Sequence, residues 1–258
     1  KKNKCIHNSI LMSYLSTYEA KQIRKHGWYN DVDLYICPSN FYKNKLEQGK
    51  FTLSKIVYMK NPLPLDTHYA ISNEIGDYVL YFGRLSSEKG LFTLVQAMEN
   101  VDYKLFIMGT GPEADKLKLE VANNKKIKNK IEFLGFKTGV ELNNYIKKAK
   151  AVIIPSEWYE NGPYSAMEAM GYGRPLIVSN IGGLPELVQD GVNGFIFNLG
   201  DKKDLSLKIN ELLTMSKSNY NKMCENSLEY AKNNFNSIRY CENLLNMING
   251  NYCEVDKK

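Results

Sequence analysis

The sequence predicts an α/β fold with a doubly wound parallel sheet, and two observations lead to this fold class. Short apolar runs recur in the second part of the chain, at 78–82, 104–108, 131–134, 151–154, 175–178 and 195–197. Amphipathic stretches with helical spacing lie between most of them, at 91–99, 113–123, 140–150 and 164–170. Strands that alternate with helices in this way are typical of a parallel sheet covered by helices on both faces.

The part of the chain before this pattern holds fewer strands. Apolar residues at helical spacing predict a helix over 10–23, and strands are expected at 32–37 and 55–59 with a short helix between them at 41–48. Two strands do not make a parallel sheet with both faces covered. We therefore expect residues 1–60 to be the remnant of an amino-terminal domain that is largely missing.

The remaining boundaries follow from composition and periodicity. Residues 61–76 begin with Asn61-Pro62-Leu63-Pro64 and stay polar, which indicates a linker. The alternating pattern then defines a second domain over 77–217. Helices are expected at 205–215, 220–232 and 238–248, and we expect residues 218–258 to pack back toward the first domain.

Composition argues against several classes of protein. The net charge of +6 is mild and diffuse, so no nucleic-acid partner is expected. The five cysteines include no C-x-x-C pair, which gives no support to a metal or disulfide framework and favours the cytoplasm. No apolar run approaches the ~18 residues of a membrane span, although the positive charge suits peripheral contact with the inner face of a membrane.

Three loops follow strands of the second domain, at the edge where open α/β sheets bind ligands. The first runs from Gly83 through Arg84 to Lys89 and Gly90, and it places two cations around a turn that ends at a helix start. A guanidinium fork, an ammonium charge and helix amides suit a diphosphate. The alternative for this loop alone is a solvated turn.

The second loop leads from Glu160 into a helix that carries Glu168. The eight-residue spacing lets both carboxylates face one cleft, and a carboxylate can accept hydrogen bonds from two adjacent ribose hydroxyls. The amides of Tyr164 and Ser165 start the helix and can donate to phosphate or sugar oxygens, whereas Pro163 has no amide hydrogen. The alternative is a capping acid and a surface acid.

The third loop, Gly182-Gly183-Leu184-Pro185-Glu186, is a tight glycine turn. Each loop is modest evidence by itself, but Arg-x4-Lys, then Glu-x7-Glu followed by Ala-Met-Gly, then Gly-Gly-x-Pro-Glu is a specific order. Over about 78–197 this order resembles glycosyltransferase family 4. Residues 33–62 also resemble the end of that family's first domain and its linker.

The resemblance implies a Rossmann-like donor domain of the GT-B type and a role for each motif residue. Arg84 and Lys89 would hold the donor diphosphate and act in catalysis, with Gly83 beside them. Glu168 would bind the ribose hydroxyls, and Glu160 would lie beside the reacting carbon of the donor sugar. The residues implied on the nucleobase side are Gly109, Thr110, Gly111, Gly135 and Phe136. Those implied near the sugar also include Gly162, Tyr164 and Ser165.

The resemblance implies that a sugar is transferred from a nucleotide-sugar with retention of configuration at the anomeric carbon. A UDP-sugar is the favoured donor. The acceptor would be a polysaccharide or a lipid-linked sugar bound by the missing domain. No cofactor is expected. No metal is expected either, because the Asp-x-Asp sequence Asp31-Val32-Asp33 lies at the amino-terminal end of a strand. Gly162-Pro163 departs from the family, where an aromatic residue and Gly are common. The alternatives are a nucleotide-sugar-binding fragment without catalysis and a GT-B epimerase.

Overall fold

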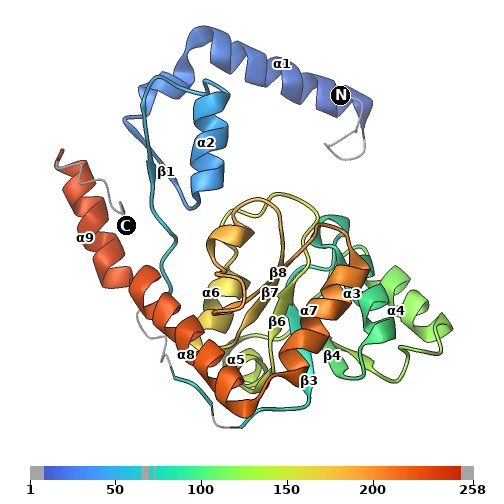
Figure 1. Cartoon of the computed structure of the whole chain (residues 1–258). Coiled ribbons are helices and arrows are strands. Elements are labelled where there is room, and N and C mark those ends of the chain that lie inside the picture. Colours follow the sequence, from blue (N-terminus) through green and yellow to red (C-terminus); the bar gives the residue numbers. More distant parts are fainter. Residues whose placement is uncertain (1–8, 65–69, 73, 251–258) are drawn as a thin grey trace. The chain divides into compact units, whose positions relative to one another are not determined.

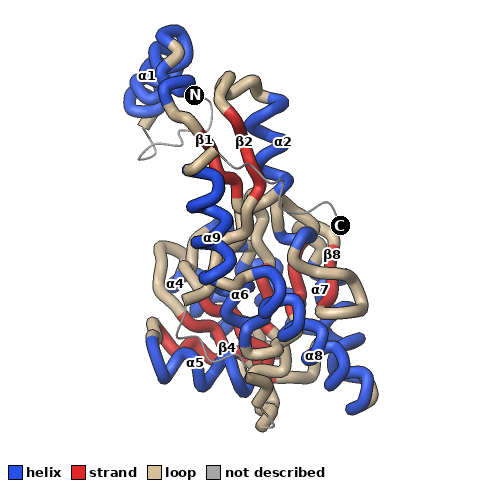
Figure 2. The backbone as a smooth tube through the Cα atoms, turned by 90° about the vertical axis from the view of Figure 1, so that its left-hand side faces the viewer, coloured by secondary structure: helices blue, strands red, loops and turns tan. Residues whose placement is uncertain are grey.

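The computed structural model describes residues 9–64, 70–72 and 74–250, and it divides the chain into two compact units between Met59 and Lys60. The first unit contains α1 (Ile10–His26), the 3-10 turn η1 (Trp28–Asp31), β1 (Leu34–Cys37), α2 (Asn40–Gln48) and β2 (Lys55–Tyr58). β1 and β2 are parallel and run side by side, with α2 as the crossover (Figure 2). Ser39 caps α2, since its hydroxyl accepts from the Tyr42 amide at 3.2 Å.

The second unit is built on a six-stranded sheet in which every pair of neighbours is parallel. Its strands are β3 (Tyr78–Phe82), β4 (Lys104–Met108), β5 (Ile131–Gly135), β6 (Val152–Ile154), β7 (Leu176–Ser179) and β8 (Gly194–Phe197). The order β5-β4-β3-β6-β7-β8 confirms the predicted doubly wound sheet. The winding direction reverses between β3 and β6, and ligands of such sheets bind beyond the carboxyl ends of the strands at that point.

Helices cover both faces of this sheet (Figure 1). The helices of the second unit are α3 (Leu91–Ala97), α4 (Ala114–Asn123), α5 (Gly139–Lys148), α6 (Tyr164–Gly171), α7 (Lys202–Thr214), α8 (Lys217–Asn234) and α9 (Ser237–Ile248), and its 3-10 turns are η2 (Ser87–Lys89), η3 (Met98–Asn100) and η4 (Leu184–Glu186). α3, α4 and α7 bury apolar residues in one core, and α5 and α6 bury theirs in the other. β3, β6 and β7 are buried along their whole length, as strands between two helical layers must be.

The linker and α8 belong to this second unit. Tyr220 and Cys224 of α8 are buried in one core, and Ala231 is buried in the other. The amide of Leu63, a buried linker residue, donates to Phe235 O at 2.9 Å. The unit therefore extends beyond the predicted 77–217 on both sides, while packing of residues 218–258 toward the first domain stays a prediction. None of the helices in the described ranges is long and apolar enough to cross a membrane.

The loops at the carboxyl edge continue the pairing of the strands. The Gly83 amide donates to Met108 O at 3.0 Å, and the Leu85 amide donates to Thr110 O at 2.9 Å. At Gly109 a Cβ would lie 1.8 Å from Gly83 O, and the backbone there has φ +132°. Glycine is thus required at this position both for space and for backbone conformation.

We predict that Gly109→Ala lowers the free energy of unfolding by roughly 2–4 kcal/mol, because a methyl group would collide with a backbone oxygen that cannot yield locally. Urea denaturation measures this change. The matched control is Gly200→Ala, where φ is also positive (+70°) but no atom lies within 4 Å, so only the conformational cost of about 1 kcal/mol is expected. Equal losses in the two variants would contradict the steric argument.

Candidate functional site: a cavity and an ion pair at the carboxyl edge

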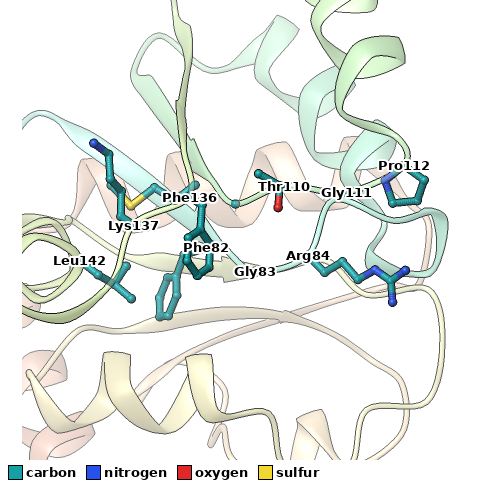
Figure 3. Close-up of a pocket in the computed structure, with 11 residues that line it drawn as sticks. Phe82, Gly83, Arg84, Thr110, Gly111, Pro112, Phe136, Lys137 and Leu142 are labelled. Atoms are coloured by element: carbon teal, nitrogen blue, oxygen red, sulfur yellow. The ribbon is translucent and has the colours of Figure 1, made fainter.

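A cavity of about 440 Å³ opens at the carboxyl ends of β3, β4 and β5 (Figure 3). It is lined by Phe82, Gly83, Arg84, Met108, Gly109, Thr110, Gly111, Pro112, Phe136, Lys137 and Leu142. Six of the predicted residues are in this lining: Gly83, Arg84, Gly109, Thr110, Gly111 and Phe136. Gly135 ends β5 just before it, and its carbonyl accepts from the Gly109 amide at 2.8 Å.

The cavity has chemically different ends. In Figure 3 Leu142 and Lys137 lie at one end with Phe82 and Phe136 next to them, and Arg84 lies at the other end beside Pro112. The Phe136 side chain is 71% exposed, so its ring is available to a ligand. Aromatic and aliphatic groups suit a planar base, and a guanidinium suits an anion. Sequence reasoning missed Phe82, Met108, Pro112, Lys137 and Leu142, although two of these are the last residues of predicted strands.

Arg84 is held through its backbone and leaves its side chain exposed. The Tyr81 hydroxyl donates to Arg84 O at 2.8 Å. Burial raises the pKa of Tyr81, which keeps this hydroxyl protonated as a donor. The guanidinium forms no salt bridge with the residues that the structure describes. Its positive charge contributes to lowering the pKa of Glu88. The charge of Arg84 is therefore available to an anionic ligand.

An ion pair spans the point where the sheet reverses its winding. Lys89, in the loop after β3, places Nζ 2.5 Å from Oε1 of Glu160, in the loop after β6. The hydroxyl of buried Ser156 donates to the same oxygen at 2.6 Å. Charge-assisted bonds of this kind fix side-chain positions firmly. The sequence predicted these two residues in separate roles, and it gave no sign that they contact each other or that Ser156 joins them.

The glycine turn after β7 supports the backbone of Glu160. The Gly183 amide donates to Glu160 O at 2.8 Å. A Cβ at Gly182 would lie 2.7 Å from both the amide nitrogen and the carbonyl oxygen of Glu160. The Ser179 hydroxyl also donates to Ser156 O at 2.6 Å. The glycine turn after β7 therefore positions the loop that carries Glu160.

Glu168 lies in the second turn of α6 and is half-buried. Burial raises the pKa of its carboxyl group. The carboxylate has no hydrogen-bonding or ionic partner among the described side chains. A carboxylate that is partly desolvated and unpaired can accept hydrogen bonds from a ligand's hydroxyl groups.

The start of α6 offers backbone donors. Ala166 makes the first amide bond of this helix, to Pro163 O at 3.1 Å, so the amides of Tyr164 and Ser165 precede it. The carbonyl of Gly162 accepts from Asn61 Nδ2 at 3.4 Å. The predicted residues on this segment lie outside the lining of the cavity, as do Lys89, Glu160 and Glu168. The structure therefore divides the predicted site into two groups of residues. One lines the cavity, and the other lies at the switch point, where the sheet reverses its winding between β3 and β6.

The acidic residues near β1 occupy a different unit. Asp31 ends η1, and Asp33 immediately precedes β1. In the described ranges no three His, Cys, Asp or Glu side chains gather closely enough to hold a metal ion.

Several curated proteins are similar in sequence. An uncharacterized glycosyltransferase of Methanocaldococcus jannaschii is 28% identical over 88% of this chain and 62% of its own length. Spore coat protein SA of Bacillus subtilis is 30% identical over 67% of this chain and 48% of its own length. The chain thus spans 62% and 48% of the lengths of these two relatives.

Solved structures share the fold. Anabaena HepE in complex with UDP and glucose superposes with a TM-score of 0.77 at 21% identity, over 90% of this chain and 67% of the other. Sucrose-phosphate synthase from Thermosynechococcus elongatus gives a TM-score of 0.75 at 22% identity, over 86% of this chain and 59% of the other. Both likenesses support the GT-B type of fold.

The most direct assignment comes from a family model. The model described as glycosyl transferases group 1 matches residues 71–234. These residues include all six strands of the second unit, the cavity and the Lys89–Glu160 pair. The chain belongs to the glycosyl transferases group 1 family.

Proposed function

We propose that this chain is the donor-binding part of a retaining glycosyltransferase that transfers a sugar from a nucleotide-sugar to a polysaccharide or glycolipid acceptor. UDP is the favoured nucleotide, and the HepE complex with UDP supports this choice. The observation that carries the proposal is the exposed cation Arg84 at the end of an apolar cavity, on the same sheet edge as the Lys89–Glu160 pair.

The donor is proposed to lie along this edge. The base takes the end of the cavity near Phe136, where the ammonium group of Lys137 is engaged by Glu141 at 2.6 Å. The ribose hydroxyls reach Glu168. The diphosphate lies between Arg84 and Lys89, and the sugar lies at Glu160. The unpaired carboxylate of Glu168 and the exposed guanidinium of Arg84 support this direction, since each meets the part of the donor that it can bind best.

The reaction requires stabilisation of charge that grows on the leaving diphosphate. Arg84, Lys89 and the amides that start α6 can supply this stabilisation without a metal ion. In the free protein Lys89 is neutralised by Glu160. A diphosphate carries more charge than one carboxylate, so the incoming donor competes for Lys89 and links donor binding to the position of Glu160.

Retention is proposed without a covalent intermediate on Glu160. Its Oε1 already accepts from Lys89 Nζ and from Ser156 Oγ, at 2.5 and 2.6 Å. Both bonds draw electron density from the carboxylate and weaken it as a nucleophile. This supports a reaction on one face of the sugar, in which the leaving phosphate takes the proton of the acceptor hydroxyl.

The second candidate function is nucleotide-sugar binding without catalysis. The chain spans 62% and 50% of the lengths of two relatives. This partial coverage favours binding without catalysis for the chain by itself. Calorimetry with UDP-, GDP- and ADP-sugars, paired with a donor-hydrolysis assay, separates the two. Binding without turnover supports the binding module, and turnover supports the transferase.

We predict that Arg84→Ala weakens UDP binding by about 10- to 100-fold, since one charge-assisted contact is worth about 1.5–3 kcal/mol. Isothermal titration calorimetry measures the change. The control is Arg239→Ala, which removes an exposed arginine of α9 and should leave UDP binding unchanged. In a full-length enzyme the same Arg84 change should slow transfer by about 10²–10³. An Arg84→Ala chain that binds UDP like the wild type would refute the diphosphate assignment.

We predict that Glu168→Gln weakens UDP binding but stabilises the fold at pH 7. The pKa of Glu168 is raised in the folded state, so the folded state binds a proton more tightly than the unfolded state does. Ionised Glu168 therefore costs stability above its folded pKa, and this cost vanishes as pH falls below the ordinary range of glutamate.

Urea denaturation at several pH values checks the second effect. Glu168→Gln should be the more stable protein at pH 7, and its advantage should disappear in acid. UDP affinity should fall by about tenfold, because an amide offers one acceptor oxygen where the carboxylate offers two. A variant that is less stable than the wild type at pH 7 would show that the carboxylate has a partner in the fold.

A further inference from the structure

A second cavity, of about 750 Å³, opens at the opposite edge of the sheet. Lys150 and Arg174 line it, and they lie shortly before β6 and β7, at the amino ends of these strands. α8 contributes Lys217, Tyr220 and Cys224 to the lining. We call this the amino-edge cavity. None of the predicted donor-site residues is in its lining, so its chemistry needs a separate explanation.

Arg174 carries a charge in the interior. Its side chain is 0% exposed. Nε donates to Tyr172 O at 3.1 Å and Nη1 donates to Ala149 O at 3.3 Å, while Nη2 finds no acceptor in the described part of the chain. The two carbonyls belong to the residues that cap the carboxyl ends of α6 and α5. The negative ends of these helix dipoles offset part of the positive charge of Arg174. Arginine does not lose its proton in proteins, so a net positive charge remains beside the cavity.

Lys150 adds a second cation to the same lining. Its Nζ lies 3.5 Å from the centroid of the Tyr220 ring, and the Tyr220 hydroxyl donates to Lys150 O at 2.7 Å. Burial lowers the pKa of Lys150, and the neighbouring charge of Arg174 lowers it further. An anion in the cavity would counteract both effects, because its negative charge would favour the charged form of Lys150.

The acids of the lining do not balance these cations. Lys150, Arg174 and Lys217 are positive, and Glu225 is the one acidic residue among the described residues that line the cavity. Glu225 is engaged at 3.6 Å by Lys222, which is outside the lining. Asn221 adds a neutral polar group. The arrangement favours a ligand with negative charge, and the volume exceeds what a bare inorganic ion fills.

We propose that the amino-edge cavity binds a small organic phosphate, with Lys150 and Lys217 at the phosphate group and the buried charge of Arg174 behind them. A phosphate monoester suits two lysines and a nearby guanidinium, because it carries up to two negative charges and several acceptor oxygens. The remaining volume holds the organic part of the ligand. The site lies across the sheet from the nucleotide cavity and does not depend on the function proposed for that cavity.

The test is calorimetry with glycerol 3-phosphate on the Arg84→Ala chain, in which phosphate contacts at the carboxyl edge are weakened. Saturable binding with one site is expected, and glycerol at equal ionic strength should not bind. Lys150→Met in the same background should weaken binding by about tenfold or more. The matched control is Lys148→Met, which removes an exposed lysine two residues earlier that pairs with Glu74 at 2.7 Å and is outside the lining.

Three results would overturn the proposal: no saturable binding at millimolar glycerol 3-phosphate, equal binding of glycerol, or equal weakening by Lys148→Met and Lys150→Met. Arg174 is left intact because a change at a fully buried arginine can prevent folding. UDP binding by the Lys150→Met chain, with Arg84 present, should match the wild type. This last measurement shows that the variant is folded and that the two sites are separate.

Discussion

Backbone packs directly on backbone at the carboxyl edge of the second sheet, and small residues at the contact points permit this packing. A Cβ at Gly109 would lie 1.8 Å from Gly83 O, and one at Gly90 would lie 1.9 Å from Pro155 O. The same relation joins Gly182 to the backbone of Glu160. Loops that follow β3, β4, β6 and β7 are thereby fixed against one another. These loops carry Arg84, Lys89 and Glu160, and the helix after the β6 loop carries Glu168.

This packing determines which charges are engaged in the free protein and which are available. Lys89 and Ser156 both donate to Glu160, so these three side chains are engaged with one another between the loops after β3 and β6. Arg84 and Glu168 have no such partner in the described ranges. A site that keeps one cation and one acid unpaired at fixed positions needs little rearrangement to bind a ligand with matching groups, which is the basis of electrostatic preorganisation. The raised pKa of Glu168 is the cost of that arrangement.

Much of this was predictable from the sequence, because periodicity and turn residues act locally. The six strands of the second unit were found within one or two residues, and so was the edge where the motifs lie. The Lys89–Glu160 contact was not predictable, since it joins loops 71 residues apart and depends on strand order. The steric role of Gly109 was also hidden, because a glycine that lines a cavity and one that admits a backbone oxygen look the same in a sequence.

A crystal structure of the chain with UDP tests the central claim most directly, namely that the carboxyl-edge cations bind the diphosphate of a nucleotide. The account predicts diphosphate oxygens within hydrogen-bond distance of the Arg84 guanidinium and of Lys89 Nζ, with the base in the cavity beside Phe136 and the ribose hydroxyls on Glu168. UDP bound with its diphosphate in contact with neither cation, and with the Lys89–Glu160 pair unchanged, would contradict it.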